Sequence, residues 1–580
     1  MIRSLISMTI VAILLIAFLA CGGGGSGGNG GSGDDSDDSG GGDLNPILAC
    51  PDNDGDGYAD ASCDGTDCDD GNPNISPLAL DICGDDIDQN CDGRDKICSD
   101  DGTAAHASLT WDGSAGICLS CHTDEAEDMY ASTHYQWQGD ALYMSHGPLK
   151  QGKIADAVNS YCINILGNWE GCGNCHVGLG AQPQAAVNPT KTQLENIDCL
   201  ICHQKEYKRI KVGDDLVPDT ANMTISLNEA VQTVHLPERT NCLQCHAKAG
   251  GGDAVKRGDL ALASAETTDV QYDVHMAVSA GDLDCRECHI FRNHKFAGKG
   301  SDIRPTDLDI DIACSACHTN KNKSNGHSSS TIGRHVSRVA CQTCHIPYYA
   351  KNANDSAATE ATEIHRTWLS TSSLMAPFHP DSTKANNLIP KYRFWNRYSE
   401  NYLLGDVARY DSSTGGFPTS RPEGFVDDET LDNKLYPFKF KTAEQPILNE
   451  TDQLIALDTK IYFETADPDL ATTAGLVNMG YVVDEAYRWV ITDTFQLLNH
   501  QISPASEALS CSDCHGNTAR IDLKGQLGYQ LKGPESQICT QCHGKEESEG
   551  FYDLHEEHVE EERYDCSRCH TFSRPERNLR

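Results

Sequence analysis

Basic side chains are scarce in this chain. Its 580 residues contain 45 Lys and Arg against 86 Asp and Glu, which gives a formal net charge of −41. This charge repels the phosphates of nucleic acids and of anionic lipid headgroups. We therefore expect no nucleic-acid partner, and no adhesion to a membrane surface without a covalent anchor.

Hydrophobic runs are short, and the one that stands out lies at the N-terminus. It extends from Leu5 to Ala20, follows Arg3 and ends before Cys21. Sixteen residues are fewer than the roughly 20 that span a bilayer. A basic start, an apolar run and a small residue before cysteine resemble a bacterial lipobox. We expect residues 1–20 to be a lipoprotein signal peptide and Cys21 to carry the lipid, with an ordinary signal peptide or a retained anchor as alternatives.

Two segments after Cys21 differ sharply in composition. Residues 21–46 are nearly all Gly, Ser and Asp, which predicts a flexible tether without a core. Residues 47–102 are rich in Asp and contain six cysteines, which predicts a small module held by three disulfides: Cys50, Cys63, Cys68, Cys83, Cys91 and Cys98. Sequence does not choose among the 15 possible pairings.

The Asp-rich module has the pattern of a calcium site. Oxygen-bearing side chains alternate around glycines that permit tight turns, as in Asp52-Asn-Asp-Gly-Asp-Gly-Tyr58. The module resembles the metal-binding repeats akin to thrombospondin type 3 repeats, and the alternative is an acidic disordered stretch. The expected calcium ligands are Asp52, Asp54, Asp56, Asp60, Asp67, Asp69, Asp85, Asp88 and Asp92.

Cysteine is abundant, and most of it follows one pattern. Ten copies of Cys-x-x-Cys-His occur where composition predicts about 0.05 by chance: Cys118-Cys121-His122, Cys172-Cys175-His176, Cys199-Cys202-His203, Cys242-Cys245-His246, Cys285-Cys288-His289, Cys314-Cys317-His318, Cys341-Cys344-His345, Cys511-Cys514-His515, Cys539-Cys542-His543 and Cys566-Cys569-His570. Two thiols at this spacing attach haem c, and the adjacent imidazole binds its iron. Scattered zinc or redox pairs are the weaker alternative, because every pair precedes His.

The sequence therefore predicts an exported decahaem cytochrome. Hydrophobic periodicity is weak, so we expect a mainly α and irregular-coil chain wrapped around its haems, with little β-structure. Residues 346–510 contain no motif but many aromatics, which we expect to pack over the haems.

Each iron also needs a second axial ligand. Thirteen histidines lie outside the motifs, enough to give most haems two imidazoles. The expected distal set is His134, His235, His275, His294, His327, His335 and His500, with His555 and His558 for the last two haems. These nine leave one haem without histidine.

Cys162 is the one cysteine with no role so far, and it lies within a wider resemblance. Residues 118–516 resemble the octahaem tetrathionate reductase family of c-type cytochromes, which is related to hydroxylamine oxidoreductases and pentahaem nitrite reductases. The resemblance rests on Cys118-Leu-Ser-Cys-His, Thr133-His-Tyr, Asn159-Ser-Tyr-Cys162, Asn196-Ile-Asp-Cys-Leu-Ile-Cys-His203, Gly250-Gly-Gly-Asp-Ala-Val-Lys-Arg-Gly-Asp259, Asp273-Val-His-Met276, Ala340-Cys-Gln-Thr-Cys-His-Ile-Pro347, Tyr402-Leu-Leu-Gly-Asp406 and Leu498-Asn-His500.

The resemblance implies which haem is the active one. In that family the second haem has a lysine as distal ligand, which implies His176 as proximal ligand, Lys256 as distal ligand, and Asp253 and Cys162 beside the pocket. It implies an octahaem reductase core over residues 103–520, and it leaves residues 521–580 as a dihaem extension. The implied substrates are tetrathionate, nitrite and hydroxylamine.

We thus expect a lipid-anchored reductase of the outer membrane, on its periplasmic or cell-surface side, that reduces a small anionic substrate. Its electron donors would be partner cytochromes or quinol-linked proteins. The alternative is an extracellular electron conduit with no substrate chemistry of its own. A lysine-ligated haem distinguishes the two, because a conduit needs no weakly held ligand.

Overall fold

A computed structural model describes most of the chain. The described residues are 52–56, 58–63, 65–77, 79, 87–89, 91, 103–158, 161–213, 215–298, 306–318, 327, 330–424, 433–515, 519–534, 537–538, 540, 554, 556–562 and 564–580. The signal peptide, the tether and the ninth motif lie outside them. Among the described residues, no helix is long and apolar enough to cross a membrane.

The motifs fold as short helical turns. In a helix, residues i, i+3 and i+4 share one face, so both cysteines and the histidine of a motif project together. These turns are α2 (Gly116–Leu119), α5 (Trp169–Cys172), η2 (Gly173–Cys175), α7 (Leu200–His203), α9 (Arg239–His246), η4 (Cys285–Glu287), η5 (Cys314–Ala316), α11 (Cys341–His345), α14 (Cys511–Cys514) and η8 (Cys566–Arg568).

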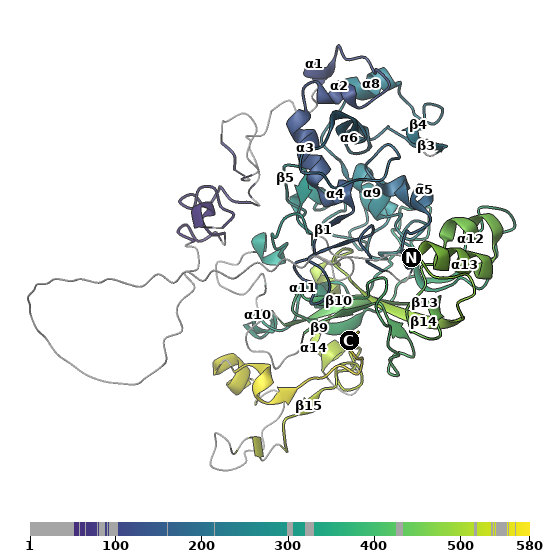
Figure 1. The fold of residues 1–580 in the computed structure, drawn as a ribbon. Helices are drawn as coiled ribbons and strands as arrows, with labels where there is room; N and C mark the ends of the chain where they lie inside the picture. The colour runs from purple at the N-terminus through teal and green to yellow at the C-terminus, as the bar shows by residue number, and fades with distance from the viewer. Residues whose placement is uncertain are drawn as a thin grey trace, which may run out of the picture. The chain divides into compact units, whose positions relative to one another are not determined.

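The first motifs lie in a helical region built from short amphipathic elements. Its other helices are α1 (Thr103–His106), α3 (Thr123–Ala131), α4 (Thr133–Gln136), α6 (Lys191–Glu195) and α8 (Leu227–Gln232) (Figure 1). Tyr130, Tyr135, Leu194 and Leu200 are buried together in its core. Ser132 caps α4 by accepting from the Tyr135 amide, and Thr190 forms a capping box on α6.

The expectation of little β-structure is wrong. Helix accounts for 23% of the structure and strand for 21%. A six-stranded mixed sheet has the order β11-β14-β13-β7-β8, with β9 also paired to β13. Its strands are β7 (Thr362–Thr367), β8 (Asp381–Ala385), β9 (Lys391–Trp395), β11 (Phe417–Pro418), β13 (Lys434–Leu448) and β14 (Tyr487–Leu497). They come from the segment without motifs, which has no haem to fold around and supplies its own hydrophobic core.

The longest pair of strands shows how this segment forms a hydrophobic core without haem. β13 and β14 are antiparallel from Phe438–Leu497 to Leu448–Tyr487. The aromatic side chains of β13 alternate along the strand, so that Tyr436 and Phe438 are buried with Trp395. Period-2 alternation of aromatics is the pattern of a strand with one apolar face.

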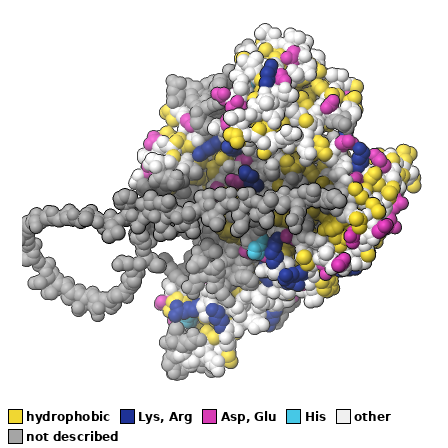
Figure 2. All heavy atoms as spheres, in the orientation of Figure 1, with side chains coloured by type: hydrophobic (Ala, Val, Ile, Leu, Met, Phe, Trp, Pro, Cys, Tyr) yellow, Lys and Arg dark blue, Asp and Glu magenta, His cyan; other side chains and the backbone are white. Residues whose placement is uncertain are grey.

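A helical hairpin, α12 (Thr459–Thr465) and α13 (Pro468–Asn478), lies beside the sheet (Figure 1). Asp458 and Asp467 cap these helices by accepting from amides of their first turns. Acidic side chains line this edge of the molecule, in keeping with the excess negative charge (Figure 2).

Small hairpins and turns complete the structure. They are β1 (Gln138–Asp140) with β2 (Lys150–Gly152), β3 (Arg209–Val212) with β4 (Asp215–Pro218), β5 (Phe291–Arg292) with β6 (Lys295–Phe296), β10 (Ser399–Asn401) with β12 (Ser420–Pro422), β15 (Gln530–Leu531) with β16 (His570–Thr571), and η1 (Ala61–Cys63), η3 (Leu262–Ala265), α10 (Ser330–His335), η6 (Ala505–Glu507) and η7 (Glu556–Glu561).

The C-terminal segment packs directly on the sheet. Ile521 and Leu527 are buried against Tyr392 and Phe394 of β9. Further along, Arg338 pairs with Asp565 at 2.8 Å. The predicted extension is therefore joined to the core by an apolar cluster and an ion pair.

Candidate functional site

Seven motif histidines face a second histidine. The ring centres lie 5.9–6.3 Å apart in the pairs His106–His122, His134–His246, His203–His294, His275–His318, His289–His500, His327–His345 and His335–His515. Two imidazole nitrogens about 2 Å from one metal, with ring centres about 1.1 Å beyond, give a separation of about 6.2 Å. The spacing fits an iron held between the rings.

Burial favours the neutral, metal-binding form of several of these imidazoles. It lowers the pKa of His246 to about 3 and the pKa of His203 and His289 to about 4. The pKa of His134 also falls, because its ring is buried. Its Nδ1 is buried without a hydrogen-bond partner, so nothing in the structure competes for that nitrogen.

Six members of the expected distal set are brought to motif histidines: His134, His275, His294, His327, His335 and His500. The seventh partner, His106, lies outside that set. It ends α1 and lies 6.0 Å from His122 of the first motif. The feature of the sequence that could have indicated this pairing is the position of His106, sixteen residues before His122.

The ring of His235 does not stack with any of the described motif histidines. The Lys205 amide donates to its Nε2 at 3.0 Å, and its Nδ1 lies 2.7 Å from the Leu236 carbonyl. The His235 carbonyl instead lies 3.0 Å from Nδ1 of His203, which orients that ring.

The final two motifs are only partly described. His558 Nδ1 lies 2.9 Å from the Leu554 carbonyl, and its ring lies 5.9 Å from Tyr564. Cys539, Cys542, His543 and His555 lie outside the described residues.

His176, of the second motif, has different surroundings. Its ring is buried among Tyr135, Trp137 and Trp169, with centres 5.0–5.4 Å away, and none of the described histidines stacks with it. Burial lowers its pKa to about 4. Arg209 holds this motif by donating to the carbonyls of Asn174 and Gly178, at 2.7 and 3.2 Å.

Lysines and Cys162 occupy the space near this motif. Lys153 lies close enough to Lys256, Cys162 and the motif thiols Cys172 and Cys175 to interact with them electrostatically. Burial, followed by repulsion from Lys256, lowers the pKa of Lys153. The structure therefore gathers the expected Lys256 and Cys162 at the second motif, and adds Lys153.

A glycine-rich turn carries Lys256. Its amide donates to the Ala249 carbonyl at 3.1 Å, and Gly250 adopts a φ of +86°, which favours glycine. In the same turn, Asp253 Oδ1 accepts from the Leu262 amide at 2.8 Å, at the start of η3.

Two buried lysines that sequence reasoning missed lie beneath the turn. Lys439 and Lys441 project from the same face of β13 and are fully buried. Lys439 donates to the Lys256 and Val255 carbonyls at 2.8 and 2.9 Å and to the hydroxyls of Tyr161 and Thr362. The feature of the sequence that could have indicated them is a pair of lysines at alternate positions within an aromatic strand.

Lys441 is held differently. It pairs with Glu363 at 3.2 Å and lies 4.0 Å above the Tyr161 ring. Glu363 also pairs with Arg366 at 2.7 Å, and Arg366 donates to the Gly250 carbonyl at 2.7 Å. Burial lowers the pKa of Lys441 to about 7, while Glu363 raises it. Lys441 and Arg366 therefore share the carboxylate of Glu363.

The acidic module brings together some of the expected calcium ligands. Oxygens of Asp54, Asp56 and Asp67 lie within 4.8 Å of one another, as do those of Asp52, Asp54 and Asp70. Asp60, Asp69 and Asp88 are outside these groups, and Asp85 and Asp92 lie outside the described residues.

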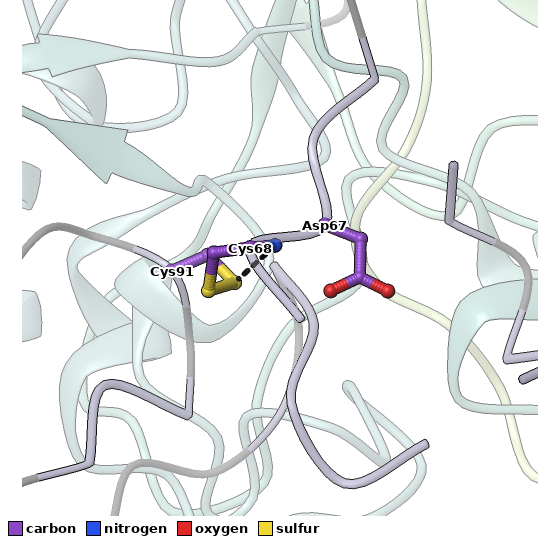
Figure 3. Close-up of side chains that lie close together, drawn as sticks. All are labelled: Asp67, Cys68 and Cys91. Atoms are coloured by element: carbon purple, nitrogen blue, oxygen red, sulfur yellow. Dashed lines mark hydrogen bonds between the residues drawn. A yellow bond between two sulfur atoms is a disulfide. The ribbon is translucent and has the colours of Figure 1, made fainter. Parts of the chain in front are cut away.

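One of the expected disulfides is described. Cys68 and Cys91 are bonded, next to Asp67 (Figure 3). Their sulfurs therefore offer no thiolate to a metal. The structure does not describe the side chains of Cys50, Cys63, Cys83 and Cys98.

Comparison with known proteins gives four family matches. Residues 117–204 match "Cytochrome c554 and c-prime", residues 380–518 match "Cytochrome c bacterial", and residues 496–571 match "Cytochrome c7 and related cytochrome c". Residues 67–96 match "Putative metal-binding motif".

Two individual proteins are similar. An uncharacterised protein of Archaeoglobus fulgidus is 28% identical over 232 residues, which cover 32% of this chain and 75% of that protein. The crystal structure of octaheme cytochrome c from Shewanella oneidensis has a TM-score of 0.60 and 26% identity, covering 72% of this chain and 95% of that one. Together with the paired imidazoles, these likenesses identify the chain as a multihaem c-type cytochrome with covalently bound haem c and a role in electron transfer.

Proposed function

We propose that this cytochrome is a reductase in which nine bis-imidazole haems pass electrons to the second haem, where a small anion is reduced. The proposal rests on the second motif, which differs from the other seven of the first eight motifs. Seven of their histidines face another imidazole at the distance that fits an iron, whereas His176 faces none among the described residues.

Lys256 is the proposed distal ligand of the second haem. An amine must lose its proton to bind a metal. An amine is held less firmly than imidazole, so a substrate atom can replace it. The family resemblance favours Lys256 over Lys153.

The pocket suits an anionic substrate. Lys441 and Arg366 share the carboxylate of Glu363, and both side chains lie over the ring of Tyr161. Tetrathionate is a dianion, and its central S–S bond takes two electrons to give two thiosulfates. Haem c would supply those electrons one at a time. Cys162 is the proposed contact for the sulfur chain, and nitrite and hydroxylamine are smaller alternative substrates.

Ten haems are proposed, one for each motif. His555 and His558 are the proposed distal ligands of the final two. Electrons would arrive from partner cytochromes or quinol-linked donors.

We further propose export and a lipid anchor at Cys21 on the outer membrane. A Cys21→Ser variant would test this by releasing the protein from membranes.

An electron conduit is the second candidate function. The motif cysteines Cys121, Cys288, Cys314, Cys317 and Cys511 are exposed, which would let electrons enter or leave at several haems. A conduit does not require ligand exchange at the second haem.

The Lys256→His variant distinguishes the two functions. It should convert the second haem to bis-imidazole ligation, retain haem content and electron uptake, and lose turnover of tetrathionate, nitrite and hydroxylamine. The matched control, Lys153→Gln, should keep the native ligation. Unchanged turnover in Lys256→His would instead support the conduit.

Cys162→Ser tests the sulfur contact. It should retain haem content and lower tetrathionate turnover more than nitrite turnover, because only tetrathionate offers an S–S bond. An equal effect on both substrates would contradict a direct role for the thiol.

A further inference from the structure

Asp259 is a fully buried carboxylate beside His500, the histidine that faces the fifth motif. Its Oδ2 lies 3.2 Å from Nδ1 of His500 and accepts from the amides of Asn499 and His500 at 2.8 and 3.1 Å. The ring of His500 faces His289 with ring centres 6.2 Å apart, the spacing that fits an iron. Because Nδ1 is turned to Asp259, Nε2 is the nitrogen left for the iron.

The surroundings of Asp259 hold it in the ionised form. Its Oδ1 accepts from Arg257 Nε at 3.3 Å, and the same guanidinium donates to the Leu497 carbonyl at 2.9 Å. A carboxylate that accepts from a guanidinium and from backbone amides is stabilised in its charged state. Since an ionised carboxylate has no proton to donate, the proton of the remaining hydrogen bond belongs to Nδ1 of His500.

Neutral carbonyls serve other ligand rings. Nδ1 of His203 lies 3.0 Å from the His235 carbonyl, and Nδ1 of His289 lies 3.1 Å from the Ala297 carbonyl. Nδ1 of His134 is buried without a hydrogen-bond partner. A carboxylate draws the Nδ1 proton more strongly than a carbonyl does, and it thereby moves electron density onto Nε2.

Glu125 also approaches a motif histidine, but more loosely. Its Oε2 lies 3.6 Å from Nδ1 of His122, which is longer than a hydrogen bond. The His122 side chain is 50% exposed, so water and salt screen the carboxylate. Asp259 is different because it is buried and in hydrogen-bond contact.

We propose that Asp259 is a positioning residue that lowers the reduction potential of the fifth haem by accepting the Nδ1 proton of His500 in a charged hydrogen bond. Electron density on Nε2 stabilises the oxidised iron, which carries one more positive charge than the reduced iron. The fifth haem would therefore give up electrons readily and pass them on to other haems. This role does not depend on which substrate, if any, is reduced at the second haem.

Two substitutions with opposite expected effects test the proposal by spectropotentiometric titration of the full-length, haem-loaded protein. Asp259→Asn keeps an oxygen for the two amides but removes the charge, so it should raise the potential of one haem. Arg257→Gln removes the cation that competes for Asp259, so it should lower the potential of that same haem. General loosening of the fold would move both variants in one direction.

The matched control is Asp411→Asn. Asp411 is also buried and paired with an arginine, Arg421 at 3.3 Å, and it accepts from the Arg577 amide. None of these partners is a haem ligand, so this variant should leave every haem potential unchanged.

His500→Met identifies the haem and separates the hydrogen bond from simple charge. Methionine binds iron through sulfur and offers no N–H to Asp259, so Asp259→Asn should have little effect in this background. The proposal is overturned if Asp259→Asn moves no haem potential, if it and Arg257→Gln move a potential in the same direction, or if its shift persists in full with Met at position 500. If Asp259→Asn does not assemble with its haems, Arg257→Gln decides alone: an unchanged or higher potential overturns the proposal.

Discussion

Lys439 and Lys441 lie two residues apart on one face of β13, and replacing Lys441 by Met should stabilise the protein more than replacing Lys439. The pKa of Lys441 is lowered from 10.5 to about 7, chiefly by burial. A shift of about 3.5 units corresponds to about 5 kcal/mol against the charged form. Met abolishes this cost, and Glu363 retains Arg366. This cost already includes the attraction of Glu363, and replacing a buried ion pair by an apolar residue often gains about 1–4 kcal/mol, so Lys441→Met should gain about 2 kcal/mol of unfolding free energy at pH 6.

The sign follows from proton linkage. Below about pH 7 Lys441 is protonated in both folded and unfolded states, so the folded state carries the full burial cost. Between about pH 7 and 10.5 only the unfolded state holds that proton, so stability rises with pH. The gain in Lys441→Met should accordingly shrink as pH rises. Lys439→Met removes four hydrogen bonds, two of them to the buried carbonyls of Val255 and Lys256, and should therefore be less stable than Lys441→Met.

Substrate binding gives the second readout. Native KM for tetrathionate should rise about tenfold, or about 1.4 kcal/mol, between pH 6 and 8 as Lys441 loses its charge. In Lys441→Met the KM should already be high at pH 6 and stay flat. Steady-state assays with a viologen donor, alongside denaturant unfolding at pH 6 and 8, measure both. Identical pH profiles in the two proteins would refute the role given to Lys441.

Two sets of variants and one mass measurement test the haem ligands, their support and their number. His106→Ala should leave the first haem with one imidazole and produce one high-spin signal by electron paramagnetic resonance, whereas His235→Ala should produce none; the reverse result would exchange their roles. Arg209→Met breaks the buried pair with Asp198 at 3.0 Å and should cost about 3–5 kcal/mol in thermal unfolding, and a loss below about 1 kcal/mol would argue against it. The intact mass of the protein should correspond to ten haems. A mass that corresponds to eight would show that the final two motifs do not attach haem.

The motifs were predictable from sequence because their chemistry is local. Two cysteines and a histidine at fixed spacing need one helical turn, and that turn forms wherever the motif is described. The distal histidines depend on tertiary structure. His294 faces His203 of the third motif, 91 residues earlier in the chain, and His500 faces His289 of the fifth motif, 211 residues earlier. No local pattern distinguishes these two histidines from His235.

The sheet was missed for a different physical reason. We expected the haems to supply the apolar core. That expectation gave a segment without motifs no reason to form a sheet of its own. Residues 346–510 build a core of their own, in which Phe438 and Trp395 are fully buried. The lysines of β13 were missed because a buried lysine is rare, and its partners Glu363 and Thr362 come from β7.

The ligation of the second haem is the central claim, and near-infrared magnetic circular dichroism of the oxidised protein tests it most directly. The charge-transfer band of a low-spin ferric haem depends on its two axial ligands, so bis-imidazole and imidazole–amine haems can be counted separately. The account predicts one imidazole–amine haem among bis-imidazole haems, and the loss of its signal in Lys256→His. A native spectrum with bis-imidazole haems alone would contradict it.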